Sequence, residues 1–206
     1  MKAPLSIRIL YWLTNVIFWL MMIISIIVFV VNLILLTDIF TEDIQLRVQM
    51  PVPIEVVEDG SVSLPNGDLT VRVEEAYGKL HLVDTPIFIT RIVARIILVM
   101  VMLGLYMLWR FRQFITNVKN GIVFEKENIN NLKQIAYGLL ALWITTMVYM
   151  EVVYQMFIKY LEFDTIIIGY ERYEMNSTIL AALGLWALAH ILMKGVEMKQ
   201  EQELTI

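Results

Sequence analysis

The chain has no cysteine and only two histidines, His81 and His190, among its 206 residues. The first absence excludes disulfides, thiolate catalysis and cysteine-ligated zinc or iron–sulfur sites. The second argues against a histidine-rich metal centre. Charged residues make up only 17% of the chain, and no basic tail or patch indicates direct nucleic acid binding. The sequence therefore predicts no metal and no other cofactor.

Recognisable catalytic motifs are also missing. The chain contains no G-x-S-x-G, no H-E-x-x-H, no paired histidines and no phosphate-binding glycine loop. Acidic residues are plentiful in 37–87, but most alternate with apolar residues, which is typical of solvated strand faces. We expect a non-enzymatic protein, because an enzyme acting on lipid would need clustered nucleophilic, acid–base or metal-binding groups.

Hydrophobic residues are abundant, at 59% of the chain with a mean hydropathy of +0.69. They gather in four segments, at 9–36, 88–109, 135–158 and 178–193. A helix needs about 20 apolar residues to cross about 30 Å of hydrocarbon, and helices of soluble proteins are apolar on one face only. The first segment is too long for a signal peptide and has no cleavage site. The sequence predicts an all-α transmembrane four-helix bundle in a lipid bilayer, as a single membrane domain.

The basic residues predict which side of the membrane each loop faces. Nine Lys and Arg precede the first apolar segment, lie in 110–134 or follow the fourth segment at 194–206, whereas five lie in 37–87 and 159–177. Short cytoplasmic loops carry the excess of positive charge. We therefore expect a cytoplasmic N-terminus, cytoplasmic loop 110–134 and cytoplasmic tail 194–206, with 37–87 and the outer loop 159–177 outside.

The segment 37–87 is expected to form a small extracytoplasmic antiparallel β-sheet cap between the first two helices. Apolar residues alternate with mostly polar ones from Ile44 to Val56, which is the period of a strand. Asp59-Gly60 and Asn66-Gly67 are turn signals. Three or four strands over four helices resemble the plan of claudins in architecture only. The cap is interpreted either as a docking or sensing surface or as a lid over the helix ends.

Three ionisable residues fall inside the apolar segments. Arg91 and Arg95 are one helical turn apart in the second segment, and Glu151 lies in the third. At about 1.5 Å per residue, Arg95 and Glu151 reach similar depths below the outer boundary. We expect an intramembrane ion pair of Glu151 with Arg95, shared with Arg91. It is interpreted either as a structural pair that orients two helices or as a proton- or ion-linked site.

Two short motifs at the predicted cytoplasmic side resemble a known family. The first is Asn120-Gly121-x-x-Phe124 with Glu127-Asn128 and Leu132, and the second is Gly195-x-Glu197-x-x-x-Glu201-Gln-Glu-Leu-Thr-Ile206. They are similar to motifs of bacterial membrane proteins of the domain of unknown function 2975 family (DUF2975). The resemblance implies four membrane helices in the bacterial cytoplasmic (inner) membrane, no established activity and no catalytic residues. It also implies, by association only, a small helix-turn-helix regulator as a partner.

Two functions follow from these patterns. The first is a non-enzymatic regulatory or accessory protein that binds a partner. Its candidate contact residues share the two motifs: Gly121, Phe124, Glu127, Asn128, Glu201, Glu203 and Leu204. The second is a subunit of a small transporter or channel, acting as a homo-oligomer, whose path would be lined by the Glu/Arg site. A stand-alone carrier is disfavoured, because the chain has no internal repeat and no paired broken helices.

Overall fold

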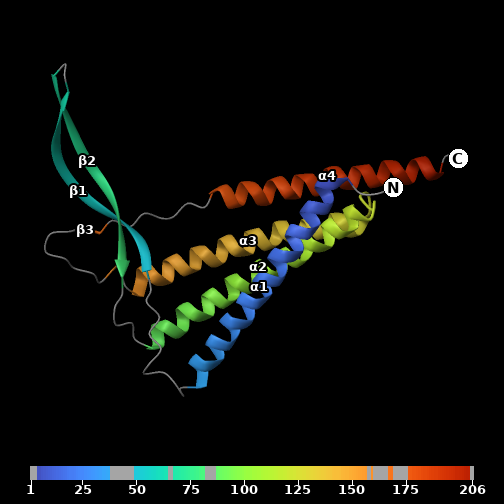
Figure 1. Cartoon of the computed structure of the whole chain (residues 1–206), viewed down its shortest axis with the longest axis horizontal. Coiled ribbons are helices and arrows are strands. Elements are labelled where there is room, and N and C mark those ends of the chain that lie inside the picture. Colours follow the sequence, from blue (N-terminus) through green and yellow to red (C-terminus); the bar gives the residue numbers. More distant parts are fainter. Residues whose placement is uncertain are drawn as a thin grey trace. The chain divides into compact units, whose positions relative to one another are not determined.

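The computed structural model describes residues 4–37, 49–64, 67–81, 87–156, 159, 167–168 and 176–204. The chain divides into two compact units. The first, the helical unit, comprises Met1–Ile39, Arg91–Thr146 and Met175–Ile206, and the second comprises Phe40–Thr90 and Met147–Glu174. The helical unit contains most of the four long helices, and the second unit contains the strands (Figure 1).

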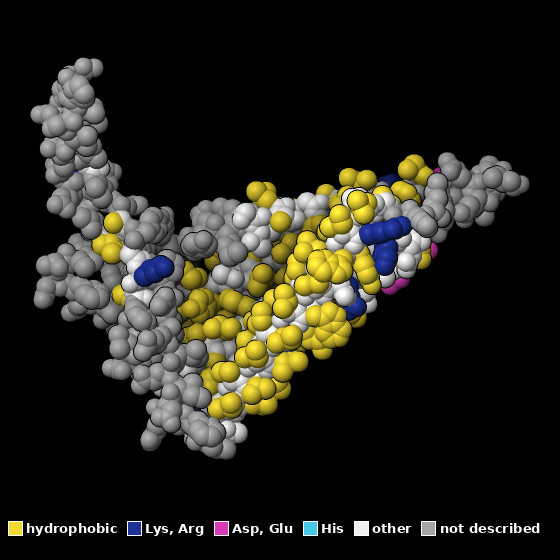
Figure 2. All heavy atoms as spheres, viewed as in Figure 1, with side chains coloured by type: hydrophobic (Ala, Val, Ile, Leu, Met, Phe, Trp, Pro, Cys, Tyr) yellow, Lys and Arg dark blue, Asp and Glu magenta, His cyan; other side chains and the backbone are white. Residues whose placement is uncertain are grey.

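The four helices are α1 (Leu5–Thr37), α2 (Ile87–Lys119), α3 (Lys126–Met156) and α4 (Asn176–Leu204). Each includes a stretch that is long and apolar enough to cross a membrane. Large apolar side chains cover the visible face of the helices (Figure 2), and many are strongly exposed, such as Trp12 at 67%. Exposed apolar surface on this scale is expected when lipid replaces water as the solvent. The chain is a multi-pass membrane protein with four helices.

Successive helices of the helical unit run antiparallel. Lys119 near the end of α2 lies over the ring of Tyr11 near the start of α1, while Arg91 near the start of α2 contacts Leu35 near the end of α1. Asn117 of α2 likewise meets Asn128 of α3. The start of α1, the α2–α3 turn and the end of α4 therefore lie at one end of the unit, which we call the basic end (Figure 1).

A small core holds α3 and α4 together near the basic end. Ile129, Leu132, Ala189 and Val196 are buried against one another, and Phe114 of α2 packs on them. Their spacing of three or four residues, and of seven along α4, places them on one face of each helix. Helix association in lipid depends on close packing of this kind, because there is little hydrophobic driving force between helices.

Close approach of α2 and α3 occurs at Gly138. A Cβ atom at this position would collide with Cγ of Met107, so the missing side chain lets the two helices meet there. The buried polar residues of α1 are Thr14, Ser25 and Asn32. The Asn32 amide donates to the carbonyl of Ala94 on α2 at 3.2 Å and ties α1 to α2.

Three helices extend well beyond the apolar segments that predict them. The predicted cytoplasmic loop 110–134 is largely helical, because α2 continues to Lys119 and α3 begins at Lys126. The predicted tail 194–206 belongs to α4 as far as Leu204. Charged and amide side chains end a hydrophobic run, but Lys, Arg, Gln and Glu are good helix formers. The membrane boundary and the helix boundary are therefore different positions.

The second unit contains a three-stranded antiparallel sheet of order β2-β1-β3. The strands are β1 (Gln49–Leu64), β2 (Gly67–His81) and β3 (Ile167–Ile168). The two long strands form a hairpin (Figure 1), and β3 pairs with Ile54 and Glu55 of β1. The first half of the alternating run, 44–48, lies outside the described residues. The predicted cap, a sheet over the outer helix ends, stays a prediction.

The turn predicted at Asp59-Gly60 is wrong. Both residues lie inside β1, where Asp59 pairs with Arg72 and Gly60 with Val71. The register shifts between Glu55 and Glu58, and this bulge accommodates an irregular sequence without ending the strand. The hairpin reverses one residue earlier than the Asn-Gly signal predicts, since Leu64 already pairs with Gly67.

Candidate functional site

The end of α2 is built around Gly121. Its φ of 82° lies in the left-handed region that favours glycine. The amide of Ile122 donates to the carbonyl of Asn117 at 2.9 Å, and the amide of Gly121 donates to that of Val118 at 3.1 Å. These two bonds are the Schellman pattern that ends many helices. Gly121 therefore ends α2 directly after Asn120.

Asn128 fixes the turn that follows. Its side chain is fully buried, at 0% exposure. The amide nitrogen donates to the carbonyls of Ile122 at 2.6 Å and Val123 at 3.1 Å, while its Oδ1 accepts from Nδ2 of Asn117 at 2.9 Å. One side chain thus satisfies two turn carbonyls and joins α2 to α3. Burial gives Asn128 a structural role inside the turn, unlike the exposed contact residues proposed beside it.

Phe124 connects the two sequence motifs. Its ring lies so close to Gly195 on α4 that a Cβ there would stand 3.0 Å from Cε1 and 3.1 Å from Cδ1. The outer side of the ring remains accessible, with 48% of the residue exposed. The Asn-Gly-x-x-Phe motif and the Gly-x-Glu motif therefore form one surface at the basic end. Sequence spacing could not reveal this contact, because the motifs lie on different helices.

The remaining candidate contact residues belong to the same two motifs. Glu127, in the first turn of α3, and Glu201, near the end of α4, are exposed. Glu203 and Leu204 belong to α4 by their backbone, and their side chains lie outside the described residues. Exposed apolar residues accompany the acids: Ile122 at 36% and Met198 at 58%. We call the exposed residues Ile122, Phe124, Glu125, Glu127, Met198 and Glu201 the turn surface.

Lysine and arginine side chains make cation–π contacts with aromatic rings at the basic end of the helical unit. Lys119 lies 3.7 Å from the ring centre of Tyr11, and Arg112 lies 4.8 Å from that of Phe18. Arg110 lies 4.4 Å from the ring centre of Trp109. Such pairs hold charge next to the amphipathic rings that concentrate at membrane–water interfaces. The sequence could not show which cation meets which ring.

Arg91 occupies a position that the sequence did not predict. Its Nε donates to the carbonyl of Leu35 at 2.9 Å, within the last turn of α1. Carbonyls in the last turn have no partner within their own helix, and the helix dipole favours a cation there. Arg91 thus caps the end of α1. Whether it also shares the predicted ion pair with Glu151 stays a prediction.

The predicted pair of Arg95 and Glu151 stays a prediction. Arg95 is exposed and belongs to the helical unit, whereas Glu151 belongs to the second unit. Glu151 is exposed too, and its Oε1 accepts a 2.9 Å hydrogen bond from Nε2 of Gln155 one turn later. Across the described part of the chain, no group of three or more His, Cys, Asp or Glu could hold a metal ion.

Comparisons with known proteins identify one relationship. No curated protein and no solved structure matches the chain. The model of the family described as "Protein of unknown function (DUF2975)" matches residues 52–206. That match includes both motifs that meet at Phe124 and Gly195, together with three of the four helices in full. The chain belongs to the DUF2975 family.

Proposed function

We propose that this protein is a non-enzymatic regulatory or accessory protein of the bacterial cytoplasmic membrane that binds a soluble partner through the turn surface. The observation that supports it most strongly is the contact of Phe124 with Gly195, which joins both motifs on one exposed surface. Gly121 and Asn128 give that surface a defined backbone. A preorganised surface loses less entropy when it binds.

The basic end is proposed to face the cytoplasm. Arg110, Arg112 and Lys119 near the end of α2 and Lys126 and Lys133 near the start of α3 all lie there. Positive charge next to membrane helices favours the cytoplasmic side. Under this orientation the hairpin of the second unit lies outside. It would cap the helices there, either as a lid or as a docking surface.

The chemistry of the turn surface favours a partner that carries both apolar and basic groups. Phe124 and Met198 supply exposed apolar area, and Glu125 and Glu127 supply negative charge beside it. Proteins that bind DNA carry basic faces, so a small helix-turn-helix regulator complements this surface. In this proposal the membrane protein holds the regulator away from DNA, and neither protein needs a catalytic residue.

The test is recovery of the partner from native membranes. The tagged protein is purified in mild detergent, and the retained proteins are identified by mass spectrometry. We expect a small soluble DNA-binding protein that is lost from Glu127→Lys and from a deletion of residues 197–206. Thr70→Lys, which places a lysine at an exposed position of β2, should retain it. Equal recovery with all of these variants would reject the turn surface as the binding site.

A subunit of a transporter or channel, formed by a homo-oligomer, is the second candidate. The exposure of Arg95 and Glu151 at membrane depth favours it, because exposed charges in lipid are costly unless another helix covers them. Glu151→Gln in proteoliposomes tests it. A variant that folds normally but loses ion flux supports a transport site, whereas loss of folding indicates a structural pair.

A further inference from the structure

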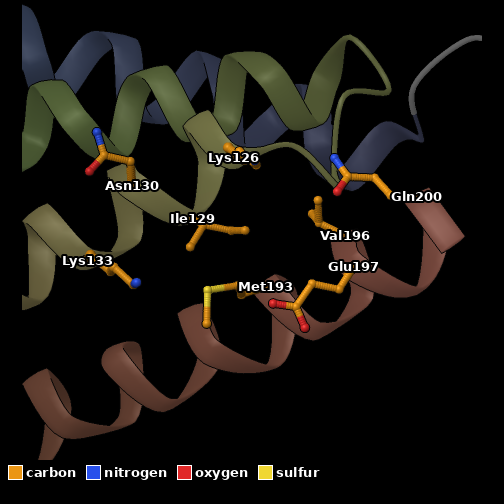
Figure 3. A pocket seen from close by; sticks show the side chains of 8 residues that line it. All are labelled: Lys126, Ile129, Asn130, Lys133, Met193, Val196, Glu197 and Gln200. Atoms are coloured by element: carbon orange, nitrogen blue, oxygen red, sulfur yellow. The ribbon is translucent and has the colours of Figure 1, made fainter.

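A groove between α3 and α4 opens at the basic end (Figure 3). Its volume is about 460 Å³, and its walls combine apolar and charged side chains. Ile129 and Lys133 of α3 and Met193 and Glu197 of α4 extend into the space between the helices (Figure 3). Lys126 completes the charged lining. We call this the basic groove.

The charge of the basic groove favours an anion. Two lysines line it, and its acid, Glu197, already has a cationic neighbour in Lys194, with Oε2 and Nζ 3.3 Å apart. Within the described ranges, neither Lys126 nor Lys133 forms an ion pair with an acidic side chain. Lysine ammonium groups near a membrane surface attract anionic headgroups.

A second cavity continues the same seam toward the membrane interior. Its volume is about 260 Å³, and its lining is almost wholly apolar. The lining residues are Ala136, Tyr137, Leu140, Ala182, Leu183 and Trp186. On α3, Ile129, Lys133, Ala136 and Leu140 follow one another at intervals of four, three and four residues. This spacing keeps both cavities on the same face of the helix.

An unpaired polar atom lies between the two cavities along α4. His190 is one helical turn from Trp186 and one turn from Met193, and its ring lies against that of Trp186, with centroids 4.4 Å apart and the planes tilted by 40°. Its Nδ1 is buried and has no hydrogen-bond partner among the described residues. A buried polar group of this kind needs a partner. Along α4, His190 thus stands between Met193, which lines the basic groove, and Trp186, which lines the apolar cavity, and it lines neither cavity itself.

We propose that the seam between α3 and α4 binds one anionic phospholipid. Its phosphate lies in the basic groove against Lys126 and Lys133, its glycerol and ester oxygens lie at the level of His190, and an acyl chain lies along Leu140 and Trp186. A free phosphate would use only the first of these features. The apolar cavity on the same helix face selects a lipid as the occupant.

Native mass spectrometry of the purified protein tests the proposal with defined lipids. The probes are long-chain phosphatidylglycerol, phosphatidylcholine with the same acyl chains, short-chain phosphatidylglycerol and inorganic phosphate. We expect one long-chain phosphatidylglycerol to be retained, with weaker retention of the other three probes. Equal retention of phosphatidylcholine would overturn the role of charge. Competition by inorganic phosphate at the affinity of the lipid would overturn the role of the apolar cavity.

Matched variants locate the site. Lys126→Gln/Lys133→Gln should bind phosphatidylglycerol about 30-fold more weakly, since each cation near the surface contributes on the order of 1 kcal/mol. Arg72→Gln/Lys79→Gln removes two exposed cations from β2 and should bind normally. Glu197→Gln removes the acid of the groove and should tighten binding, which keeps the test decisive if the lysine variants fold poorly. Unchanged affinity in both groove variants would reject the site.

Discussion

The ring of Phe124 packs on Gly195, so that any side chain at position 195 would meet Cε1 of the ring at 3.0 Å. This contact joins the α2–α3 turn to α4 at the basic end. It depends on a residue without a side chain on one partner and on a flat ring on the other.

Gly195→Val should therefore displace Phe124 and lower the thermal midpoint of the protein in detergent. Forcing extra atoms into a packed contact costs about 1–3 kcal/mol. Gly184→Val on the same helix is the matched control, because no atom lies within 4 Å of a Cβ there. Adding Phe124→Ala to Gly195→Val should recover part of the loss. No difference between Val at 195 and Val at 184 would contradict the contact.

Gly121 should tolerate asparagine better than alanine. Its φ of 82° is strained for residues with a Cβ, at a cost of about 1–3 kcal/mol, and asparagine adopts this region more readily than other residues. We expect the free energy of unfolding to fall in the order glycine, asparagine, alanine. Space is not the cause, since no atom lies within 4 Å of a Cβ at 121. Equal stability of all three proteins would refute the left-handed cap.

Asn128→Asp should be nearly as harmful as Asn128→Ala. Aspartate keeps an acceptor for Nδ2 of Asn117, but it cannot donate to the carbonyls of Ile122 and Val123. Each buried group left unpaired costs about 1–3 kcal/mol. Hydrogen exchange of the amides in 120–128 should accelerate in both variants. Protection equal to that of the unmodified protein would show that the turn does not depend on this amide.

Arg91→Leu should weaken the junction of α1 with α2 more than Arg95→Leu does. Only the first change removes a donor to the carbonyl of Leu35, and an unpaired carbonyl in lipid costs several kcal/mol at most. Arg91→Lys should be intermediate, because it keeps the charge at the helix end. The readout is the thermal midpoint in detergent. An effect of Arg95→Leu equal to that of Arg91→Leu would argue against a cap at Arg91.

The four membrane helices could be predicted from the sequence because apolar length alone determines them. The stop at Gly121 could be predicted as well, since Asn-Gly pairs favour the left-handed backbone that ends a helix. The apolar segments alone do not give the ends of α2 and α4, although the charged residues 194–206 are themselves typical of a helix. The apolar run of α2 gives way to charged residues at about residue 109, and that of α4 at about residue 193. Helical hydrogen bonding continues through these charged residues to Lys119 and Leu204.

Contacts between residues far apart in the chain could not be predicted from the sequence. The pattern of charges could not show that Nε of Arg91 donates to the carbonyl of Leu35 in the last turn of α1. Phe124 and Asn128 were grouped as contact residues because their motif was distinctive. Packing separates them: the Asn128 side chain at the start of α3 is buried, whereas the Phe124 ring in the α2–α3 turn is half exposed and packs against Gly195 of α4. Asp59-Gly60 has turn chemistry, yet the pairing of its neighbours keeps it inside β1.

The bond from Arg91 to Leu35 also constrains how the protein enters the membrane. During synthesis α1 emerges first, and the carbonyl of Leu35 has no donor from α2 until Arg91 follows. An arginine without a partner is costly in the bilayer. Arg91 avoids this cost if the unpaired carbonyl of Leu35 is already beside it when it enters. We expect α1 and α2 to enter the lipid together as a helical hairpin, so that α1 stays at the insertion machinery until α2 has been synthesised.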